Sequence, residues 1–263
     1  MLTFIKLGGS LITDKRQERS FRAEVMSRLA AEIAAARAAD PDLQLLIGHG
    51  SGSFGHIAAS KHGTMDGVHT RAQWQGFTEV ALAAAELNYH VRTALFEAGV
   101  PVLTVQPSAS ARCEDGHLLI MNIFSIKAAV NHGLVPLIYG DVAFDDERGG
   151  TIISTETVMS YVASDLPVRQ ILLLGEVEGV LDQAGELIPE ITPQNIREYE
   201  SALGGSAGTD VTGGMLTKVY DMLRLARSRP NLTIRICDGR DEGLLKSTLL
   251  GETTPGTLIH RPR

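Results

Sequence analysis

The chain has 263 residues, of which 44% are hydrophobic and 21% charged, and it contains only two cysteines; this composition excludes a disordered protein and a disulfide scaffold. Its 31 acidic and 24 basic residues give a net charge of −7, which argues against a protein that coats nucleic acid. No apolar stretch approaches the ~20 residues of a membrane span, and with no signal-peptide pattern at the N-terminus we expect a cytoplasmic protein.

Apolar runs and helical periodicity alternate along the chain. In chain order they predict a strand at 3–7, a helix at 22–37, strands at 43–47 and 100–105 around a helix at 75–98, strands at 135–139 and 170–174, a helix at 215–227 and a strand at 233–237. Most of the strands are nearly continuous in apolar residues, which is typical of strands buried on both faces. With no linker or repeat, the pattern predicts a single α/β domain, residues 1–263, with a mainly parallel sheet.

Glycine-rich segments follow several of these strands. Gly8-Gly9-Ser10 follows the first strand, and Gly140-Asp141 follows the strand at 135–139. The segment 48–56 follows the second strand, and four of its first eight residues are glycine. Ligands of parallel sheets bind beyond the carboxyl ends of the strands, where glycines let backbone N–H groups approach an anion. We therefore expect an anion site at this edge of the sheet.

Two other readings of these glycines are disfavoured. Residues 50–55 formally match the GxGxxG dinucleotide fingerprint, but no strand is predicted between them and Asp66, so a dehydrogenase fits poorly. The P-loop pattern GxxxxGK[ST] is absent, as are CxxC, HExxH and EF-hand patterns. We expect no metal site built from protein side chains.

Cationic side chains accompany the first two loops. Lys6 lies inside an apolar strand just before Gly8, and Lys15 follows nine residues later. His56 ends the second glycine segment and could donate a hydrogen bond to a phosphate. We expect His49, seven residues earlier, to support the strand end instead.

A second glycine pair, Gly213-Gly214, precedes the last predicted helix, and Lys218 lies one turn into it. Two glycine-rich anion sites and several lysines, without a recognisable nucleophile, indicate phosphoryl transfer. In that reaction lysines, backbone N–H groups and a nucleotide-bound Mg²⁺ neutralise the charge of the donor.

The sequence resembles the amino-acid kinase superfamily and, within it, the isopentenyl phosphate kinases. The matching segments are Lys6-Leu7-Gly8-Gly9-Ser10, Thr13-Asp14-Lys15, the run from His49 to His56, Tyr139-Gly140-Asp141-Val142 and the run from Asp210 to Lys218. The ending Gly-Ser-Phe-Gly-His at 52–56 is similar to the isopentenyl phosphate kinases and the related fosfomycin kinases.

The resemblance implies an open αβα sandwich with a mainly parallel central sheet, usually found as a homodimer. Residues 1–145 would bind the phosphate acceptor, and residues 146–263 would bind ATP with its Mg²⁺. The implied reaction is ATP-dependent phosphorylation of isopentenyl phosphate to isopentenyl diphosphate, a step of isoprenoid biosynthesis. An alkyl phosphate is largely a dianion at neutral pH, so the transfer needs charge stabilisation and no general base.

The resemblance also assigns roles to residues. The expected catalytic residues are Lys6, Lys15 and His56, with His56 donating to the acceptor phosphate. The expected contacts to the acceptor come from Ser51, Gly52, His56 and Gly140. The expected contacts to ATP come from Lys6, Gly8, Gly9, Ser10, Gly52, Gly213, Gly214 and Lys218.

Two segments depart from the common family pattern. Ser154-Thr155-Glu156-Thr157 stands where many members have Ser-Gly-Asp-Asp, so Glu156 is our candidate for the carboxylate that orients the lysines. Glu176-Val177-Glu178-Gly179 replaces Asp-Val-Asp-Gly, which leaves the nucleotide contacts there open. For the apolar tail of the acceptor we expect a pocket lined by residues such as Trp74, Phe77 and Leu82.

Several alternatives remain open at this point. A kinase for fosfomycin or another small phosphonate or phosphate is the nearest. Carboxylate kinases, such as those for glutamate or aspartate, fit less well because of His56. A non-catalytic anion-binding protein on the same fold is the alternative from another class.

Overall fold

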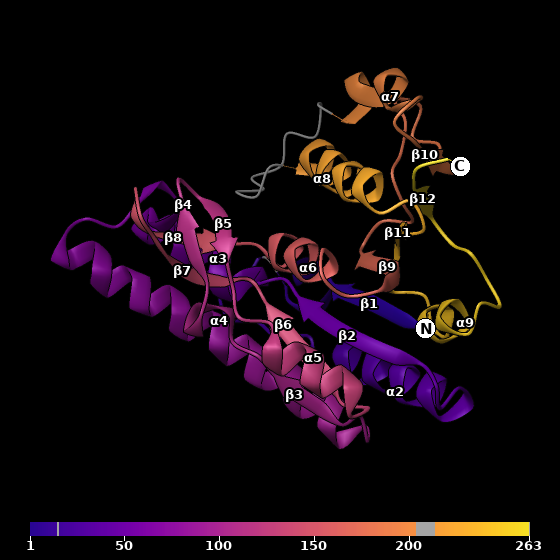
Figure 1. Ribbon diagram of the computed structural model, residues 1–263, viewed down its shortest axis with the longest axis horizontal. Coiled ribbons are helices and arrows are strands. Elements are labelled where there is room, and N and C mark those ends of the chain that lie inside the picture. The colour runs from indigo at the N-terminus through magenta and orange to yellow at the C-terminus, as the bar shows by residue number, and fades with distance from the viewer. Residues whose placement is uncertain (15, 204–213, 263) are drawn as a thin grey trace.

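The computed structural model describes residues 1–14, 16–203 and 214–262, and a large twisted sheet runs through its centre (Figure 1). The strands of this sheet, in spatial order, are β10 (Glu190–Ile191), β12 (Thr257–Ile259), β11 (Thr233–Asp238), β9 (Val168–Gly175), β1 (Leu2–Leu7), β2 (Gln44–His49), β6 (Val135–Tyr139) and β3 (Val102–Thr104). Neighbouring strands are parallel except for the antiparallel pair β11 and β12. All six strands predicted from the sequence are present in it.

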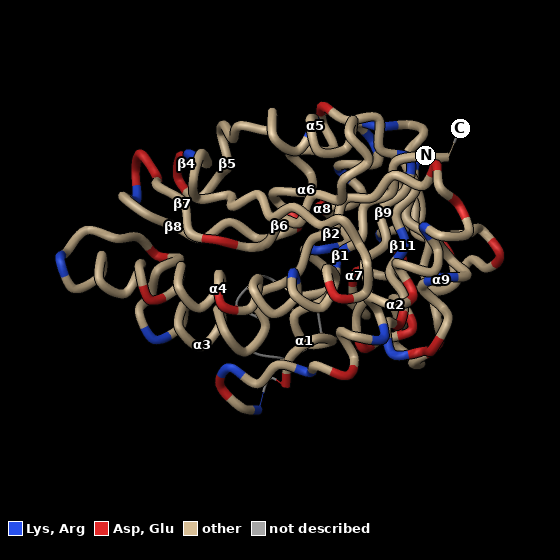
Figure 2. The backbone as a smooth tube through the Cα atoms, turned by 90° about the horizontal axis from the view of Figure 1, so that it is seen from below, with Lys and Arg blue, Asp and Glu red and all other residues tan. Residues whose placement is uncertain are grey.

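Helices cover both faces of this sheet, as Figure 2 shows in side view. One layer contains α1 (Gly9–Ile12), α2 (Ala23–Ala39), α3 (Gly52–His62), α4 (Arg71–Glu97) and α9 (Leu244–Leu249). The other contains α5 (Phe124–Asn131), α6 (Thr155–Ala163) and α8 (Gly214–Ser228), and α7 (Ile196–Leu203) packs beside α8. Alternate strand residues bury into opposite cores, so that Phe4 belongs to one apolar cluster and Ile5 to the other. The predicted open αβα sandwich is confirmed.

A second, four-stranded sheet lies at one end of the molecule, beside α3 and the start of α4 (Figure 1). Its strands, in spatial order, are β5 (His117–Ile120), β4 (Arg112–Glu114), β7 (Asp141–Asp145) and β8 (Gly149–Ile153). Two short 3₁₀ turns lie close to it, η1 (Thr64–Asp66) and η2 (Pro107–Ala109). The sequence analysis did not predict this sheet.

Two element boundaries differ from the prediction. Helix α4 begins at Arg71 rather than at 75, because Thr70 and Gln73 form a capping box at its N-terminus. The glycine segment 48–56 is not one loop: its first two residues end β2, and α3 already begins at Gly52. The connecting loop is therefore only Gly50 and Ser51, and His56 lies one turn inside a helix.

Two further features concern the chain as described. None of its helices is both long and apolar enough to cross a membrane. Cys113 and Cys237 are buried as separate free thiols.

Candidate active site

A cavity of about 330 Å³ opens at the carboxyl ends of the central parallel strands. Its walls include Lys6 of β1, Gly140 after β6, Leu174 of β9 and Ile236 of β11. Residues of the glycine segments that follow β1 and β2 also line it, namely Gly8, Gly9, Ser10, Gly50 and Ser51. The cavity thus lies where parallel sheets place their ligands.

The two glycine segments pack back to back beside the cavity. A Cβ atom on Gly9 would lie 2.5 Å from the backbone nitrogen of Gly52, and one on Gly50 would lie 2.9 Å from the backbone nitrogen of Gly9. Gly52 adopts a φ of +50°, and a Cβ there would lie 2.2 Å from Oγ1 of Thr13. Only glycine allows this approach, so these residues are needed for packing as well as for any contact with an anion.

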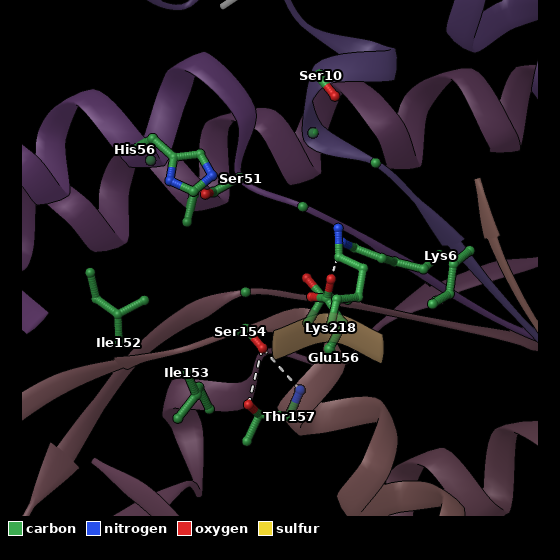
Figure 3. Close-up of a pocket in the computed structure, with 18 of the residues that line it drawn as sticks. Lys6, Ser10, Ser51, His56, Ile152, Ile153, Ser154, Glu156, Thr157 and Lys218 are labelled. Carbon is green, nitrogen blue, oxygen red and sulfur yellow. Dashed lines mark hydrogen bonds and ion pairs between the residues drawn. The ribbon is translucent and has the colours of Figure 1, made fainter. Parts of the chain in front are cut away.

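Lys6 forms an ion pair with Glu156 at the centre of the cavity (Figure 3). Glu156 lies in the first turn of α6, where the Ser154 side chain caps the helix by accepting a 3.0 Å hydrogen bond from the backbone N–H of Thr157. Burial raises the pKa of Glu156, but attraction to Lys6 and to Lys218 outweighs burial and holds the pKa below its ordinary value. Glu156 is therefore a carboxylate at neutral pH.

Lys218 approaches the same carboxylate from α8 (Figure 3). Met215 and Asp221, on the same helix, also line the cavity, together with Gly175 at the end of β9 and Val177 two residues after it. Burial raises the pKa of Asp221, with Glu156 adding to the rise and Arg224 opposing it. This side of the cavity therefore combines cationic, acidic and apolar groups.

His56 lies on the opposite side of the cavity from Lys218, beside Ser51 (Figure 3). It projects from α3, and Ala59 lines the cavity nearly one turn further along. Beyond it the wall is apolar and comes from Met65 of η1, Val80 and Ala84 of α4 and Ile152 of β8. A polar centre thus continues into an apolar end.

His49 supports the strand end and does not line the cavity. It is fully buried, its Nδ1 lies 3.1 Å from the Gly50 carbonyl oxygen, and its Nε2 lies 3.1 Å from the Asn88 side-chain nitrogen. Burial lowers its pKa to about 4, and nearby Lys6 lowers it further while the bond to Gly50 opposes the change. Neutral His49 donates from Nδ1 to Gly50 and accepts at Nε2 from Asn88.

Most of the residues predicted for the site line this one cavity: Lys6, Gly8, Gly9, Ser10, Ser51, His56, Gly140 and Lys218. Gly52 packs against Gly9 behind the wall, and Gly214 begins α8 next to Met215. Lys15 and Gly213 lie outside the described residues. The functional roles given to all of these residues stay predictions.

The predicted lining of the apolar end was wrong. Leu82 is 62% exposed, and Trp74 and Phe77 pack against each other and against Phe144. The α4 residues that do line the cavity, Val80 and Ala84, are smaller and one turn apart. Their four-residue spacing on the apolar side of the helix was the signal that could have found them.

Sequence and structure comparisons agree on the family. The family model of the amino acid kinase family matches residues 1–238. This chain belongs to the amino acid kinase family. Within that family it is 33% identical to the isopentenyl phosphate kinase of Methanocaldococcus jannaschii over 96% of each chain. It is 38% identical to that of Haloferax volcanii over 85% of this chain and 88% of the relative. A solved family member described as isopentenyl phosphate kinase superposes with a TM-score of 0.84 at 27% identity, covering 98% of this chain and all of that one.

Proposed function

We propose that this amino acid kinase transfers the γ-phosphoryl group of ATP to isopentenyl phosphate and so forms isopentenyl diphosphate. The observation that carries the proposal is the cavity itself, in which a cationic, glycine-lined centre continues past His56 into an apolar end. An alkyl monophosphate has this same polarity, with a dianionic head and an apolar tail. The similarity to isopentenyl phosphate kinases over nearly the whole chain supports the same substrate.

The phosphate acceptor needs positioning more than activation. A phosphomonoester has a second pKa near 6, so its oxygens are already nucleophilic at neutral pH. In our proposal His56 donates a hydrogen bond to the acceptor phosphate, and the loop residues Ser51, Gly52 and Gly140 offer backbone N–H groups. Lys6 and Lys15 neutralise the phosphoryl group in transfer, and Glu156 orients Lys6.

The nucleotide is proposed to occupy the side of the cavity formed by β9, β11 and α8. Its phosphates would meet Gly8, Gly9 and Ser10 from the first loop, and Gly213, Gly214 and Lys218 at the start of α8. Gly8 and Gly9 line the cavity without side chains, which lets phosphate oxygens approach the backbone closely. Among the described residues no cluster of three His, Cys, Asp or Glu side chains could hold a metal ion, so the expected Mg²⁺ would be held chiefly by the phosphates.

This assignment divides the one domain into two halves. Residues 1–145 would bind the acceptor and residues 146–263 the nucleotide, with phosphoryl transfer taking place between β1 and α6.

The free thiols suit a reducing compartment, and we propose a cytoplasmic enzyme.

We also propose that the chain forms a homodimer through α4. Leu82, Tyr89 and Phe96 follow one another at seven-residue spacing on this helix and are 62%, 56% and 71% exposed. Residues seven apart on a helix lie on one stripe, which a second copy of the same helix can cover.

The test is Mg²⁺-dependent release of ADP from ATP with isopentenyl phosphate, dimethylallyl phosphate, fosfomycin and glutamate in parallel. We expect the highest kcat/KM with isopentenyl phosphate and loss of turnover in Lys6→Ala. Highest turnover with fosfomycin or glutamate would overturn the substrate assignment. ATP binding without turnover of any acceptor would favour a non-catalytic anion-binding protein.

A further inference from the structure

The apolar end of the cavity is closed by segments that lie far apart in the sequence. Met65 comes from η1, Gly116 from the turn between β4 and β5, and Ile152 from β8. None of the three is held by the main sheet. Ile152 is held by the pairing of β8 with β7, whereas the relative positions of Met65 and Gly116 depend on contacts among the turns.

Asp145, at the end of β7, joins two of the turns. Asp145 is 4% exposed, and its carboxylate accepts backbone hydrogen bonds from Asp115 and Gly116 of one turn, at 3.1 and 2.7 Å, and from Glu147 and Arg148 of the other, at 3.0 and 2.8 Å. Burial raises the pKa of Asp145, but these four donors outweigh burial and hold the pKa below its ordinary value. The β4–β5 turn is thereby fixed to the β7–β8 turn.

Arg148 adds the third segment. Its Nε and one terminal nitrogen donate to Oδ1 of Asp115, at 2.9 and 2.8 Å, and its other terminal nitrogen donates to the backbone carbonyl of Met65 at 3.1 Å. The Arg148 carbonyl also accepts a 2.7 Å hydrogen bond from the N–H of Val68, just after η1. A single guanidinium thus bridges two of the segments that line the cavity.

Gly116 shows how closely this bridge fits. Its φ is +80°, and a Cβ atom there would lie 3.0 Å from a terminal nitrogen of Arg148. The guanidinium therefore lies directly against the backbone that lines the cavity. Displacing it would free both Gly116 and Met65 to move away from the cavity.

The position of this bridge relative to His56 points to its role. In Figure 3 His56 and Ile152 lie on the same side of the cavity, away from Lys6 and Lys218. An acceptor whose phosphate meets His56 would point its tail past Ala59 toward Met65 and Gly116. Accepting the proposed function, we infer that Arg148 is a positioning residue that closes the tail end of the acceptor pocket and so sets the selectivity for the alkyl chain.

The experiment compares acceptors of increasing length, namely ethyl, propyl, butyl and isopentenyl phosphate. In the wild type each buried carbon raises kcat/KM by about fourfold, which corresponds to about 0.8 kcal/mol per CH₂. In Arg148→Ala the gain from the distal carbons disappears, so kcat/KM for isopentenyl phosphate falls by about tenfold or more while that for ethyl phosphate and the KM for ATP change by less than about twofold. Arg148→Lys keeps a cationic donor, so its kcat/KM for isopentenyl phosphate should fall less than that of Arg148→Ala.

Two further variants make the comparison specific. Asp115→Gly suits the φ of +46° at that position and removes only the carboxylate partner, so it should show a smaller loss with the same dependence on chain length. Arg112→Ala breaks an exposed ion pair with Asp146, 2.7 Å long, in the same small sheet but away from the cavity wall, and should leave the whole series unchanged.

Each result decides a different point. A loss that is equal for all acceptors, or a raised KM for ATP, would show a general structural role and overturn the inference. Unchanged selectivity in both Arg148→Ala and Asp115→Gly would also overturn it while leaving the proposed function intact. If the wild type neither phosphorylates alkyl phosphates nor binds them in calorimetry, the proposed function fails and the inference fails with it.

Discussion

Glu156 was predicted from the sequence to take the place of a shorter acid in the family pattern and to orient the lysines. Its extra methylene is compatible with the site, because its carboxylate forms an ion pair with Lys6 across the cavity. The helix start at Ser154 fixes the backbone beneath it, and the carboxylate lies close to the positive end of α6. These contacts make it the residue through which the second half of the chain can orient a lysine of the first.

Replacing Glu156 tests that orientation. In Glu156→Gln the ammonium of Lys6 loses its charged partner, so we expect kcat to fall by about tenfold or more while folding is retained. Glu156→Asp shortens the reach of the carboxylate, so its kcat should lie between those of the wild type and Glu156→Gln. Steady-state kinetics would measure the effect, with Glu252→Gln, an exposed acid after α9, as the control. Wild-type kcat in Glu156→Gln would rule out the orienting role.

His49 makes stability depend on pH. Its pKa in the folded protein is about 4, below the ordinary 6.5, so between these values the unfolded chain binds the proton and the folded chain does not. The free energy of unfolding is therefore highest above pH 6.5 with respect to this group, and it declines as the pH falls towards 4. The loss between pH 7 and pH 5 should be about 2 kcal/mol.

Urea unfolding at these two pH values checks the prediction. His49→Gln, which keeps a neutral polar side chain, should lower the stability at pH 7 and remove most of this pH dependence. The exposed His132→Gln should leave it as in the wild type. An unchanged pH dependence in His49→Gln would assign the effect to other groups.

At the scale of elements, the sequence predicted six of the eight strands of the main sheet, because each of them lies in a largely apolar run of five or more residues. It missed β10 and β12, which are only two and three residues long. It missed the small sheet because two of its strands are only three and four residues long and largely exposed. A signal was present at Asp115-Gly116, since Asp-Gly between short runs favours a hairpin turn. The wall built by Met65 and Gly116 was beyond prediction, because it depends on contacts of Arg148 across long stretches of chain.

The glycine segments were predicted as anion-binding loops, and the structure shows a second reason for their composition. The loops after β1 and β2 touch backbone to backbone, so part of the glycine signal arises from packing. Gly9→Ala would place a Cβ 2.5 Å from the Gly52 nitrogen and force the two loops apart. We expect kcat/KM to fall by about a hundredfold or more, because both phosphate positions move.

Gly99→Ala is the matched control for this prediction. Gly99 has a φ of +87° and nothing within 4 Å of an added Cβ, so the substitution strains the backbone far from the cavity. It should lower the thermal unfolding temperature and leave kcat/KM within about twofold of the wild type. Equal losses of activity in both variants would mean that stability, and not loop spacing, limits the enzyme.

Over the whole molecule, most charged residues lie away from the cavity in which the reaction is proposed to occur. The net charge is −7, and the acidic and basic residues lie mainly on helices and loops around a largely uncharged sheet (Figure 2). Lys6 is an exception, since it is 9% exposed at the end of a central strand. A buried cation beside backbone N–H groups attracts an anion through short-range contacts, so an acidic surface is compatible with polyanionic substrates.

The apolar stripe on α4 gives a prediction for the assembled protein. Phe96 is 71% exposed at the end of the stripe formed with Leu82 and Tyr89. If two copies of α4 pack along this stripe, Phe96→Asp buries a carboxylate in the interface and should weaken the dimer by about a hundredfold or more. Sedimentation velocity over a range of concentrations would measure the shift towards monomer, and Ile120→Asp, 56% exposed on β5 of the small sheet, should leave the dimer intact.

The cavity is enclosed by elements of one chain, so the monomeric variant should keep kcat within about threefold of the wild type. A Phe96→Asp protein that stays dimeric would place the contact on another surface, and one that loses turnover together with the dimer would show that the partner copy holds the cavity in shape.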